Sequence, residues 1–359
     1  MSTQTRDALW ERLAALGLVQ GLLPDKSETR APWYVRVMLG IAGWMGALFL
    51  FSFVGAMFAF VMENAFASIA LGGMVCAGAT LIFRSQPKGD FAGQFGLATS
   101  LAGQVLIAYG LAKWFGNRVW PTCFAMAAAQ AGLFVLVPHF VHRVLTAWVS
   151  ALLVSIALAD LRLHPFTPAL VTAAFAWVWI REFDFFFRVT AARAGGYGLA
   201  LAAMQVTVMH GELWTQWLHD KAGGPLGGHL GMWLGAILSA AVLLWAVFLL
   251  LRREQVALDS ARGRIALAGA AILGLASLKA PGIGPAAAIL VVGYANGNRV
   301  LAGLGILALL GYLSHFYYAL HATLLEKSAI LACTGIALLA ARLAVQRFWP
   351  NEAKEVSRA

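Results

Sequence analysis

Charged side chains are scarce in this sequence. Asp, Glu, Lys and Arg together make up 12% of its 359 residues, about half the share found in a soluble domain. Hydrophobic residues make up 61%, and they form continuous runs instead of the short alternating segments of a membrane β-barrel. This composition excludes a soluble globular domain, a disordered chain and a barrel. We predict an all-α fold, a polytopic transmembrane helical bundle.

Cysteine is also rare. The three cysteines, Cys76, Cys123 and Cys333, all lie in apolar stretches, and no C-x-x-C pair exists. The chain is therefore not a disulfide-stapled secreted domain, and its cysteines predict neither a redox pair nor a metal site. No phosphate-binding loop, Ser-His-Asp order or H-E-x-x-H motif occurs either. We expect no metal and no cofactor, we identify no catalytic residue, and the sequence favours a protein that is not an enzyme.

Ionisable residues are missing from the middle of every apolar run. The acidic residues near these runs, such as Glu63, Asp160 and Glu326, lie at their ends. Because a proton- or sodium-coupled carrier commonly holds a carboxylate near the bilayer midplane, such coupling is disfavoured. The polar side chains inside the runs are neutral, and we expect them to form interhelical hydrogen bonds. They are Ser100, Gln104, Tyr109, Gln130 and Gln205.

Glycine, by contrast, is abundant, with 37 residues that lie mostly inside the apolar runs. Two groups stand out, namely Gly40, Gly43 and Gly46, and Gly195, Gly196 and Gly198. Small residues allow helices to approach closely in a membrane. We therefore expect both groups to lie at helix–helix contacts.

About twelve apolar runs approach the length of roughly 20 residues that crosses a bilayer. They are 36–60, 65–83, 94–114, 119–138, 141–159, 165–183, 188–209, 229–251, 263–280, 284–296, 299–320 and 324–345. The tenth has only 13 residues, so it is either a tilted short span or a broken helix. Residues 1–35 predict a short amphipathic helix at the cytoplasmic membrane surface. The remainder divides into upstream transmembrane helices (36–278), a C-terminal transmembrane block (279–346) and a cytoplasmic tail (347–359).

The charges that are present are unevenly distributed. The chain has 26 Lys and Arg against 16 Asp and Glu, a net charge of +10. If the N-terminus is cytoplasmic and twelve runs cross, 20 of the 26 basic residues face the cytoplasm, which is the orientation that basic loops impose. The other six are Lys113, Arg118, Arg162, Lys221, Lys279 and Lys327. We predict that both termini are cytoplasmic and that the cytoplasmic face contacts anionic lipids of the bilayer; nucleic acid is not expected as a partner.

The C-terminal block contains the most distinctive motifs. It begins with Ala-Pro-Gly-Ile at 280–283, and a Gly-Asn-Arg turn follows the short run at 297–299. A second turn carries the pattern Tyr-Tyr-x-Leu-x-x-Thr-Leu-Leu-x-Lys-Ser at 317–328. A Gly-x-x-Leu-Leu-x-x-Arg pattern then occupies 335–342.

These motifs, over about the last 80 residues, resemble the bacterial membrane family known as domain of unknown function 4401 and the related 2157 family. The resemblance implies a multi-pass protein of the bacterial inner (cytoplasmic) membrane with no established activity. It further implies a component of a membrane assembly, beside a smaller membrane-anchored protein partner with a Gly-Asp-Tyr signature.

Two turns of this block contain the candidate site residues. The outer hairpin gathers aromatic and polar side chains at an interface depth that suits Tyr rings; they are His315, Tyr317, Tyr318, His321, Thr323, Glu326, Lys327 and Ser328. Thr323 and Glu326 have capping-box spacing, and Lys327 can reach lipid phosphate. The pattern predicts a well-capped structural hairpin, a substrate or lipid-headgroup site, or a partner-docking edge. The cytoplasmic turn contains Asn296, Asn298 and Arg299, and we interpret it as a structural turn with a charged anchor.

The sequence leaves three functions open. The first is transport or handling of a small amphipathic or lipid-like substrate, and the polar and aromatic outer hairpin supports it. The second is a non-catalytic scaffold or subunit of a membrane assembly. The third is an intramembrane lipid-linked transferase, which needs convergent acid and base groups, and only His315, His321, Glu326 and Lys327 could provide them.

The orientation gives a direct test. A reporter that is active only in the periplasm, fused after Ala359, should be silent, because the basic loops hold the C-terminus on the cytoplasmic side. The same reporter inserted in the long outer loop at 210–228 should be active and serves as the control. An active C-terminal fusion would contradict the arrangement of twelve spans.

Overall fold

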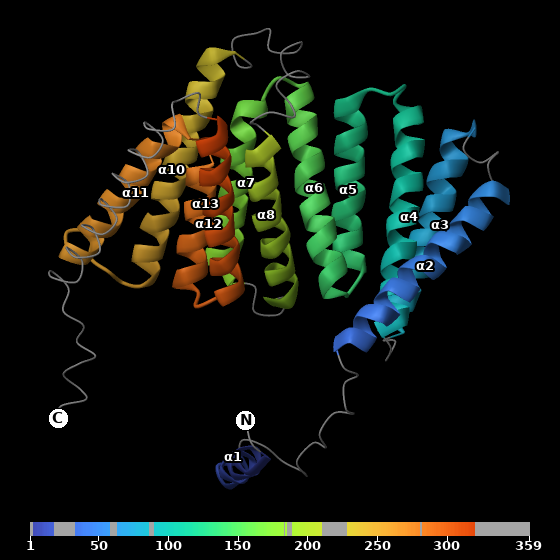
Figure 1. The fold of residues 1–359 in the computed structure, drawn as a ribbon, viewed down its shortest axis with the longest axis horizontal. Helices are drawn as coiled ribbons and strands as arrows, with labels where there is room; N and C mark the ends of the chain where they lie inside the picture. The colour runs from blue at the N-terminus through green and yellow to red at the C-terminus, as the bar shows by residue number, and fades with distance from the viewer. Residues whose placement is uncertain are drawn as a thin grey trace. The chain divides into compact units, whose positions relative to one another are not determined.

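The computed structural model describes residues 3–17, 33–57, 63–85, 90–182, 184, 189–209, 228–280 and 282–319. Every regular element in these residues is a helix (Figure 1). The helices are α1 (Thr3–Ala15), α2 (Trp33–Met57), α3 (Ala65–Arg84), α4 (Asp90–Trp114), α5 (Val119–Leu136), α6 (Phe140–Asp160), the 3₁₀ helix η2 (His164–Phe166), α7 (Thr167–Ile180), α8 (Val189–Met209), α10 (His229–Arg253), α11 (Ala261–Lys279), α12 (Ile283–Ala295) and α13 (Arg299–Ala319).

These bounds confirm the all-α fold and the helical segments expected up to residue 320. The predicted N-terminal helix is α1, and the predicted run at 165–183 is shorter than expected because it begins as η2 and ends at Ile180. The predicted helix at 324–345 lies outside the described residues. Among the described residues, six helices are long and apolar enough to cross a membrane, as expected of a membrane protein; they are α3, α4, α5, α6, α10 and α11.

Two central helices are short. α7 has 14 residues and α12 has 13, so each is about 20 Å long against a hydrocarbon layer of about 30 Å. More than half of the residues of each helix are nevertheless buried. In α12 the buried residues are continuous from Gly284 to Ile289. Protein neighbours, rather than lipid, therefore surround most of their length.

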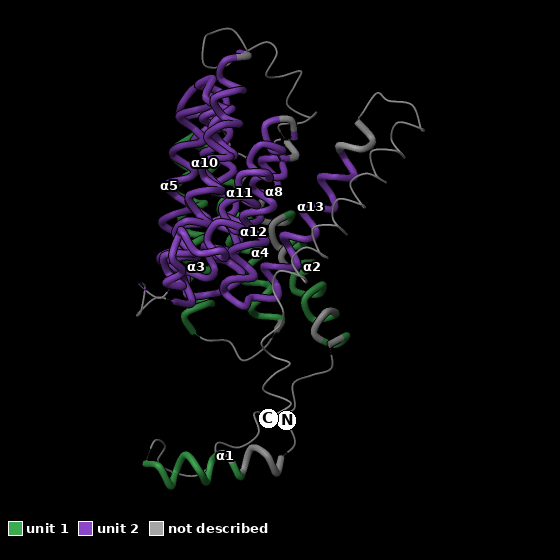
Figure 2. The backbone as a smooth tube through the Cα atoms, turned by 90° about the vertical axis from the view of Figure 1, so that its left-hand side faces the viewer, with its two compact units in different colours: residues 1–110 green, residues 111–359 purple. Residues whose placement is uncertain are grey.

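The described chain forms two compact units, residues 1–110 and 111–359 (Figure 2). In the first unit, α3 and α4 meet along a seam of small residues. A Cβ added to Gly72 would lie 2.6 Å from the carbonyl oxygen of Gly103, and one added to Gly110 would lie 2.7 Å from that of Ala65. Only glycine leaves room for backbones this close. The seven-residue spacing of Gly103 and Gly110 keeps the contact on one face of α4.

The first predicted glycine group lies partly at such a contact. A Cβ on Gly43 of α2 would lie 3.1 Å from both Gln94 Cβ and the Phe91 carbonyl oxygen of α4, whereas nothing lies within 4 Å of one on Gly46. Beside this contact, Trp44 Nε1 donates a hydrogen bond of 3.1 Å to Gln94 Oε1. The expected close approach is therefore confirmed at Gly43.

In the second unit, α7 and α12 lie at the centre of the packing. α12 packs against α7, α8, α10, α11 and α13, and α7 packs against α6, α8, α10 and α12. The core they form includes Phe175 and Trp179 of α7, Ile289 of α12 and Leu301 of α13, all at 1% exposure or less. α12 belongs to the C-terminal block by sequence, yet its side chains pack in the same core as the upstream helices.

Several helices of the second unit end in a left-handed residue. At the end of α10, Gln255 has φ 55°, while its N–H bonds to Arg252 and the N–H of Val256 bonds to Leu251. This is the hydrogen-bond pattern that usually places glycine at the left-handed position. Gly297 has φ 61° in the equivalent place after α12. A side chain in this conformation costs about 1–2 kcal/mol.

Replacing Gln255 with Gly should therefore stabilise the second unit by about 1 kcal/mol, because glycine adopts the left-handed conformation without strain. The neighbouring Glu254 has φ −82°, so Glu254→Gly serves as the control and should bring no such gain. Thermal unfolding of both variants in detergent measures the difference. Equal shifts in the two variants would contradict this account of the turn.

Candidate functional site

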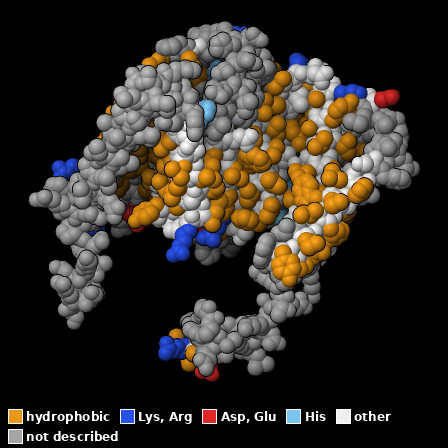
Figure 3. Space-filling view, in the orientation of Figure 1, with side chains coloured by type: hydrophobic (Ala, Val, Ile, Leu, Met, Phe, Trp, Pro, Cys, Tyr) orange, Lys and Arg blue, Asp and Glu red, His pale blue; other side chains and the backbone are white. Residues whose placement is uncertain are grey.

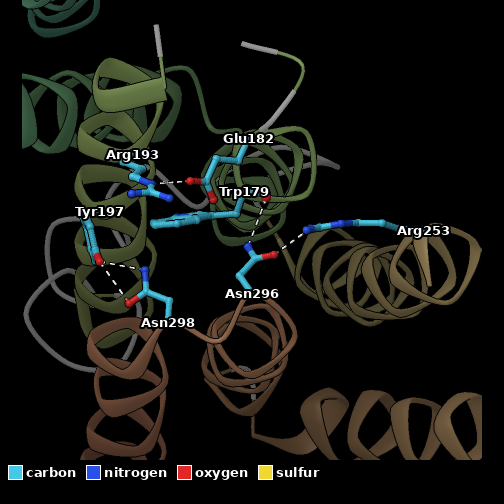
Figure 4. A network of polar contacts seen from close by, with 7 residues as sticks. All are labelled: Trp179, Glu182, Arg193, Tyr197, Arg253, Asn296 and Asn298. Atoms are coloured by element: carbon cyan, nitrogen blue, oxygen red, sulfur yellow. Dashed lines mark hydrogen bonds and ion pairs between the residues drawn. The ribbon is translucent and has the colours of Figure 1, made fainter. Parts of the chain in front are cut away.

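The turn predicted at Asn296, Asn298 and Arg299 is the centre of a polar network in the second unit. The turn joins α12 to α13 and lies against the C-terminal ends of α7 and α10 and the first part of α8 (Figure 4). Two of the three predicted residues, Asn296 and Asn298, point into this network (Figure 4). Arg299 begins α13 and is exposed.

Asn296 connects α7 to α10. Its Nδ2 donates a hydrogen bond of 3.2 Å to the main-chain carbonyl of Trp179, which lies in the last turn of α7, where carbonyl groups commonly take partners from outside the helix. Its Oδ1 accepts a hydrogen bond of 2.7 Å from a guanidinium nitrogen of Arg253 at the end of α10. One amide thus satisfies the end of one helix and fixes the basic end of another.

Asn298 connects the turn to α8. Its Nδ2 donates to the hydroxyl of Tyr197 at 2.8 Å, and that hydroxyl lies 3.1 Å from Asn298 Oδ1. The same Oδ1 accepts the main-chain N–H of Leu301 at 3.1 Å. Asn298 is therefore both the N-cap of α13 and a link to Tyr197, because a short amide side chain before a helix can bond the free N–H groups of its first turn.

Trp179 fills the space beneath these links. Its indole is 1% exposed and packs directly on Gly196, where an added Cβ would lie 2.4 Å from Nε1. Its ring meets Tyr197 edge to face, with centroids 5.1 Å apart. Gly198 allows a similar approach to the Val144 carbonyl at 2.6 Å, which confirms the close contact expected of the second glycine group at Gly196 and Gly198.

One carboxylate lies at the edge of the network. Glu182 is 3% exposed and pairs with the guanidinium of Arg193 on α8. A buried carboxylate is costly unless it is paired and hydrogen-bonded, and Arg193 supplies this pairing. The pair ties the segment after α7 to the first turns of α8.

Eight arginines share the end of the second unit that contains the network. The ends of α7, α8, α10, α12 and α13 meet there. The start of α6 lies at the same end, because Phe140 contacts Tyr197. The start of α11 also lies there, because the short 254–260 loop joins it to the end of α10. The arginines are Arg143, Arg181, Arg193, Arg252, Arg253, Arg262, Arg264 and Arg299. The half-buried His139 lies directly before α6, and burial lowers its pKa.

The outer hairpin lies mostly beyond the described residues. His315 belongs to α13, and its ring centroid lies 6.4 Å from that of Tyr312. Tyr317 and Tyr318 form part of the last turn of α13, and their side chains are not described. His321, Thr323, Glu326, Lys327 and Ser328 lie outside the described residues.

A small apolar hollow lies one turn before His315. Its volume is about 120 Å³, somewhat less than the roughly 150 Å³ of a protein cavity that takes up benzene. It opens between α8, α12 and α13, and its lining is almost entirely apolar; the lining residues are Met204, Thr207, Gly282, Pro285, Ala286, Leu307, Ala308, Gly311 and Tyr312. The ring of Tyr312 closes one side by packing on Gly282.

Sequence reasoning identified the turn but not its partners. No sequence motif contains Trp179, Tyr197 or Arg253. The available signals were weak: Tyr197 lies between two glycines of a predicted helix contact, and Arg253 follows the end of an apolar run. The described residues contain no group of three or more His, Cys, Asp or Glu placed to hold a metal. The network can fix helix ends, and the hollow can accept an apolar group.

One known protein family matches most of the chain. The profile of the family described as Domain of unknown function (DUF4401) matches residues 32–348. This range contains both the network and the hollow, and it extends far upstream of the C-terminal motifs that carried the resemblance. No curated protein matches the chain. No solved structure matches it either.

Removing the Tyr197 hydroxyl tests the network. Tyr197→Phe should lower stability by about 1–2 kcal/mol, because it deprives the half-buried amide of Asn298 of its partner. Tyr294→Phe is the matched control, since Tyr294 is 83% exposed, and it should be silent. Thermal unfolding in detergent, extended to a double-mutant cycle with Asn298→Ala, measures the coupling. Additive effects in that cycle would contradict the link.

Proposed function

The chain belongs to the DUF4401 family, and we propose that it is a bacterial inner-membrane protein that handles a small amphipathic or lipid-like substrate. The observation that carries this proposal is the apolar hollow between α8, α12 and α13. It lies directly beside the first residue of the predicted outer hairpin. A hollow of this kind, next to a polar and aromatic edge, suits a molecule with an apolar chain and a polar head.

The chemistry of the hollow selects the apolar part of such a substrate. Cavities lined by apolar atoms stay dry and take up apolar molecules of about the size of benzene. The hollow has about this capacity, so it accommodates a segment of an aliphatic chain or a ring. Thr207 and Tyr312 place the few polar atoms near it, although the Thr207 hydroxyl donates to the carbonyl of Ala203 within its own helix.

The polar head would lie at the outer hairpin. His315 follows Tyr312 by one helical turn, and in the predicted topology Tyr317, Tyr318, His321 and Lys327 lie at the same depth. Phenol hydroxyls and an ammonium can hold a phosphate or a carboxylate at the membrane surface. The substrate would thus extend from this surface into the hollow.

The proposed topology has about twelve spans with both termini in the cytoplasm. Eight arginines at the network end of the second unit support this orientation, because basic residues collect on the cytoplasmic side. Arg118 and Arg162 lie at the opposite ends of α5 and α6. The hollow then opens toward the outer half of the bilayer.

A scaffold or subunit of a membrane assembly is the second candidate. Wide apolar faces favour it, since only 22% of the apolar window of α11 is buried. Ile265, Ile272 and Leu275 of this helix are all exposed. Such a face can pack against lipid or against the helix of a membrane-anchored partner protein.

Filling the hollow tests the proposal. Nothing lies within 4 Å of a Cβ added to Gly311, which lines the hollow, or to Gly303, which does not. Both glycines belong to α13, so Gly303→Leu is a matched control for Gly311→Leu. Membrane vesicles containing each protein are given a phospholipid with a photoactivatable acyl chain, and the labelled peptides are mapped by mass spectrometry.

The expected result is labelling of α8, α12 and α13 peptides in the wild type and in Gly303→Leu, and labelling at least fivefold weaker in Gly311→Leu. The reason is that the added side chain occupies the space of the acyl segment. Equal labelling of the two variants would contradict substrate handling at this hollow and would favour the scaffold.

A further inference from the structure

We propose that the adjacent C-terminal ends of α7 and α10 form a binding site for an anionic phospholipid. The site is distinct from the hollow and goes beyond the proposed function. Trp177 of α7 and Trp245 of α10 stack in parallel, with ring centroids 6.5 Å apart and planes at 6°. Both helices run toward the network end, because Trp179 and Arg253 bond the same Asn296.

Two arginines stand over aromatic rings at this place. The guanidinium carbon of Arg181 lies 4.0 Å from the centroid of the Trp177 ring, and that of Arg252 lies 4.6 Å from the centroid of Phe248. Each arginine follows its ring by one helical turn. A guanidinium that stacks face to face on an aromatic ring still points its N–H groups outward, because they lie in the guanidinium plane. Stacking therefore holds both arginines in place and leaves these donors available for phosphate oxygens.

The exposure of the aromatic ring and its arginine suits a headgroup at the membrane interface. Trp177 is 43% exposed, and its arginine is half exposed. Tryptophan rings are enriched at the membrane interface, and arginine at this level meets the headgroup phosphates. The pairing therefore matches a bound lipid better than a solute dissolved in water.

Apolar stripes lead away from the two arginines along the surface. On α7 the stripe contains Leu170, at 50% exposure, and the exposed Ala174. On α10 it contains Leu234 and Leu238, each at 40% exposure. From Leu170 to Arg181 the stripe extends about 16 Å, at 1.5 Å per residue. Acyl chains can lie along this surface while the headgroup meets the arginines.

The charges around the site favour an anion. Arg181 has one ion pair in the described residues, with Asp184 at 3.9 Å, and both side chains are more than half exposed, so the pair is weak. The neighbouring carboxylate of Glu182 is buried and forms an ion pair with Arg193. Arg253, beside Arg252, adds a third positive charge at the end of α10. On the face of the molecule drawn in Figure 3, Lys and Arg side chains lie at the lower edge of a wide apolar surface.

The test uses the full chain in a neutral detergent, titrated with phosphatidylglycerol or with phosphatidylcholine of the same acyl chains. The double variant Arg181→Gln/Arg252→Gln is compared with Arg264→Gln/Arg299→Gln, which removes the same charge from exposed arginines at the same end. Glycerol phosphate, which has the headgroup chemistry without acyl chains, is a third ligand. Thermal unfolding is the readout.

Phosphatidylglycerol should raise the melting temperature of the wild type and of the Arg264/Arg299 variant, while phosphatidylcholine and glycerol phosphate should not. In the Arg181/Arg252 variant the shift should fall to less than half. A further variant, Trp177→Phe, keeps a ring beneath Arg181 and should retain most of the shift, whereas Trp177→Leu should lose it.

Two results would overturn the proposal. If the Arg264/Arg299 variant loses as much of the shift as the Arg181/Arg252 variant, the lipid responds to general surface charge. If glycerol phosphate gives the full shift, the site binds a free phosphate and not a lipid. Since labelling of the hollow is a separate measurement, failure here leaves the proposed function intact, and the converse also holds.

Discussion

The turn between α12 and α13 holds the second unit together at one end. Two asparagines on either side of Gly297 bond to α7, α8 and α10, so that one short segment connects these three helices with α12 and α13. This is the position where a membrane protein can make such bonds, because the ends of helices carry unsatisfied carbonyl and N–H groups. Within the hydrocarbon layer the same helices depend on close packing of small and apolar side chains.

The short central helices depend on this arrangement. A helix of 13 or 14 residues does not reach across the hydrocarbon layer by itself. α7 and α12 are stable at this length because other helices surround them, and because the Asn296 amide satisfies the last turn of α7. Trp179 then needs Gly196 opposite it, since any larger residue would collide with the indole.

The outer surface of the same unit has a different character. Apolar side chains cover the faces of α10, α11 and α13, and the polar groups collect at the ends. The two proposed binding places follow this division, since each combines an apolar surface with a polar edge. The hollow lies toward the C-terminal end of α13, and the arginine pair lies at the network end of α7 and α10.

The sequence by itself determined the membrane class, the positions of the helices and the place of the Asn296 turn. Hydrophobic length, glycine spacing and turn residues are local properties, and they can be read within a few turns of chain. Only the tertiary structure decided that Asn298 would meet Tyr197, 101 residues away, and that Asn296 would meet Trp179, 117 residues away. The physical reason is that no local pattern encodes which distant helix end lies opposite a turn. That choice follows from how all the helices pack together. The same packing decided the buried Glu182–Arg193 pair, the hollow beside Tyr312 and the stacked pair of Trp177 and Trp245.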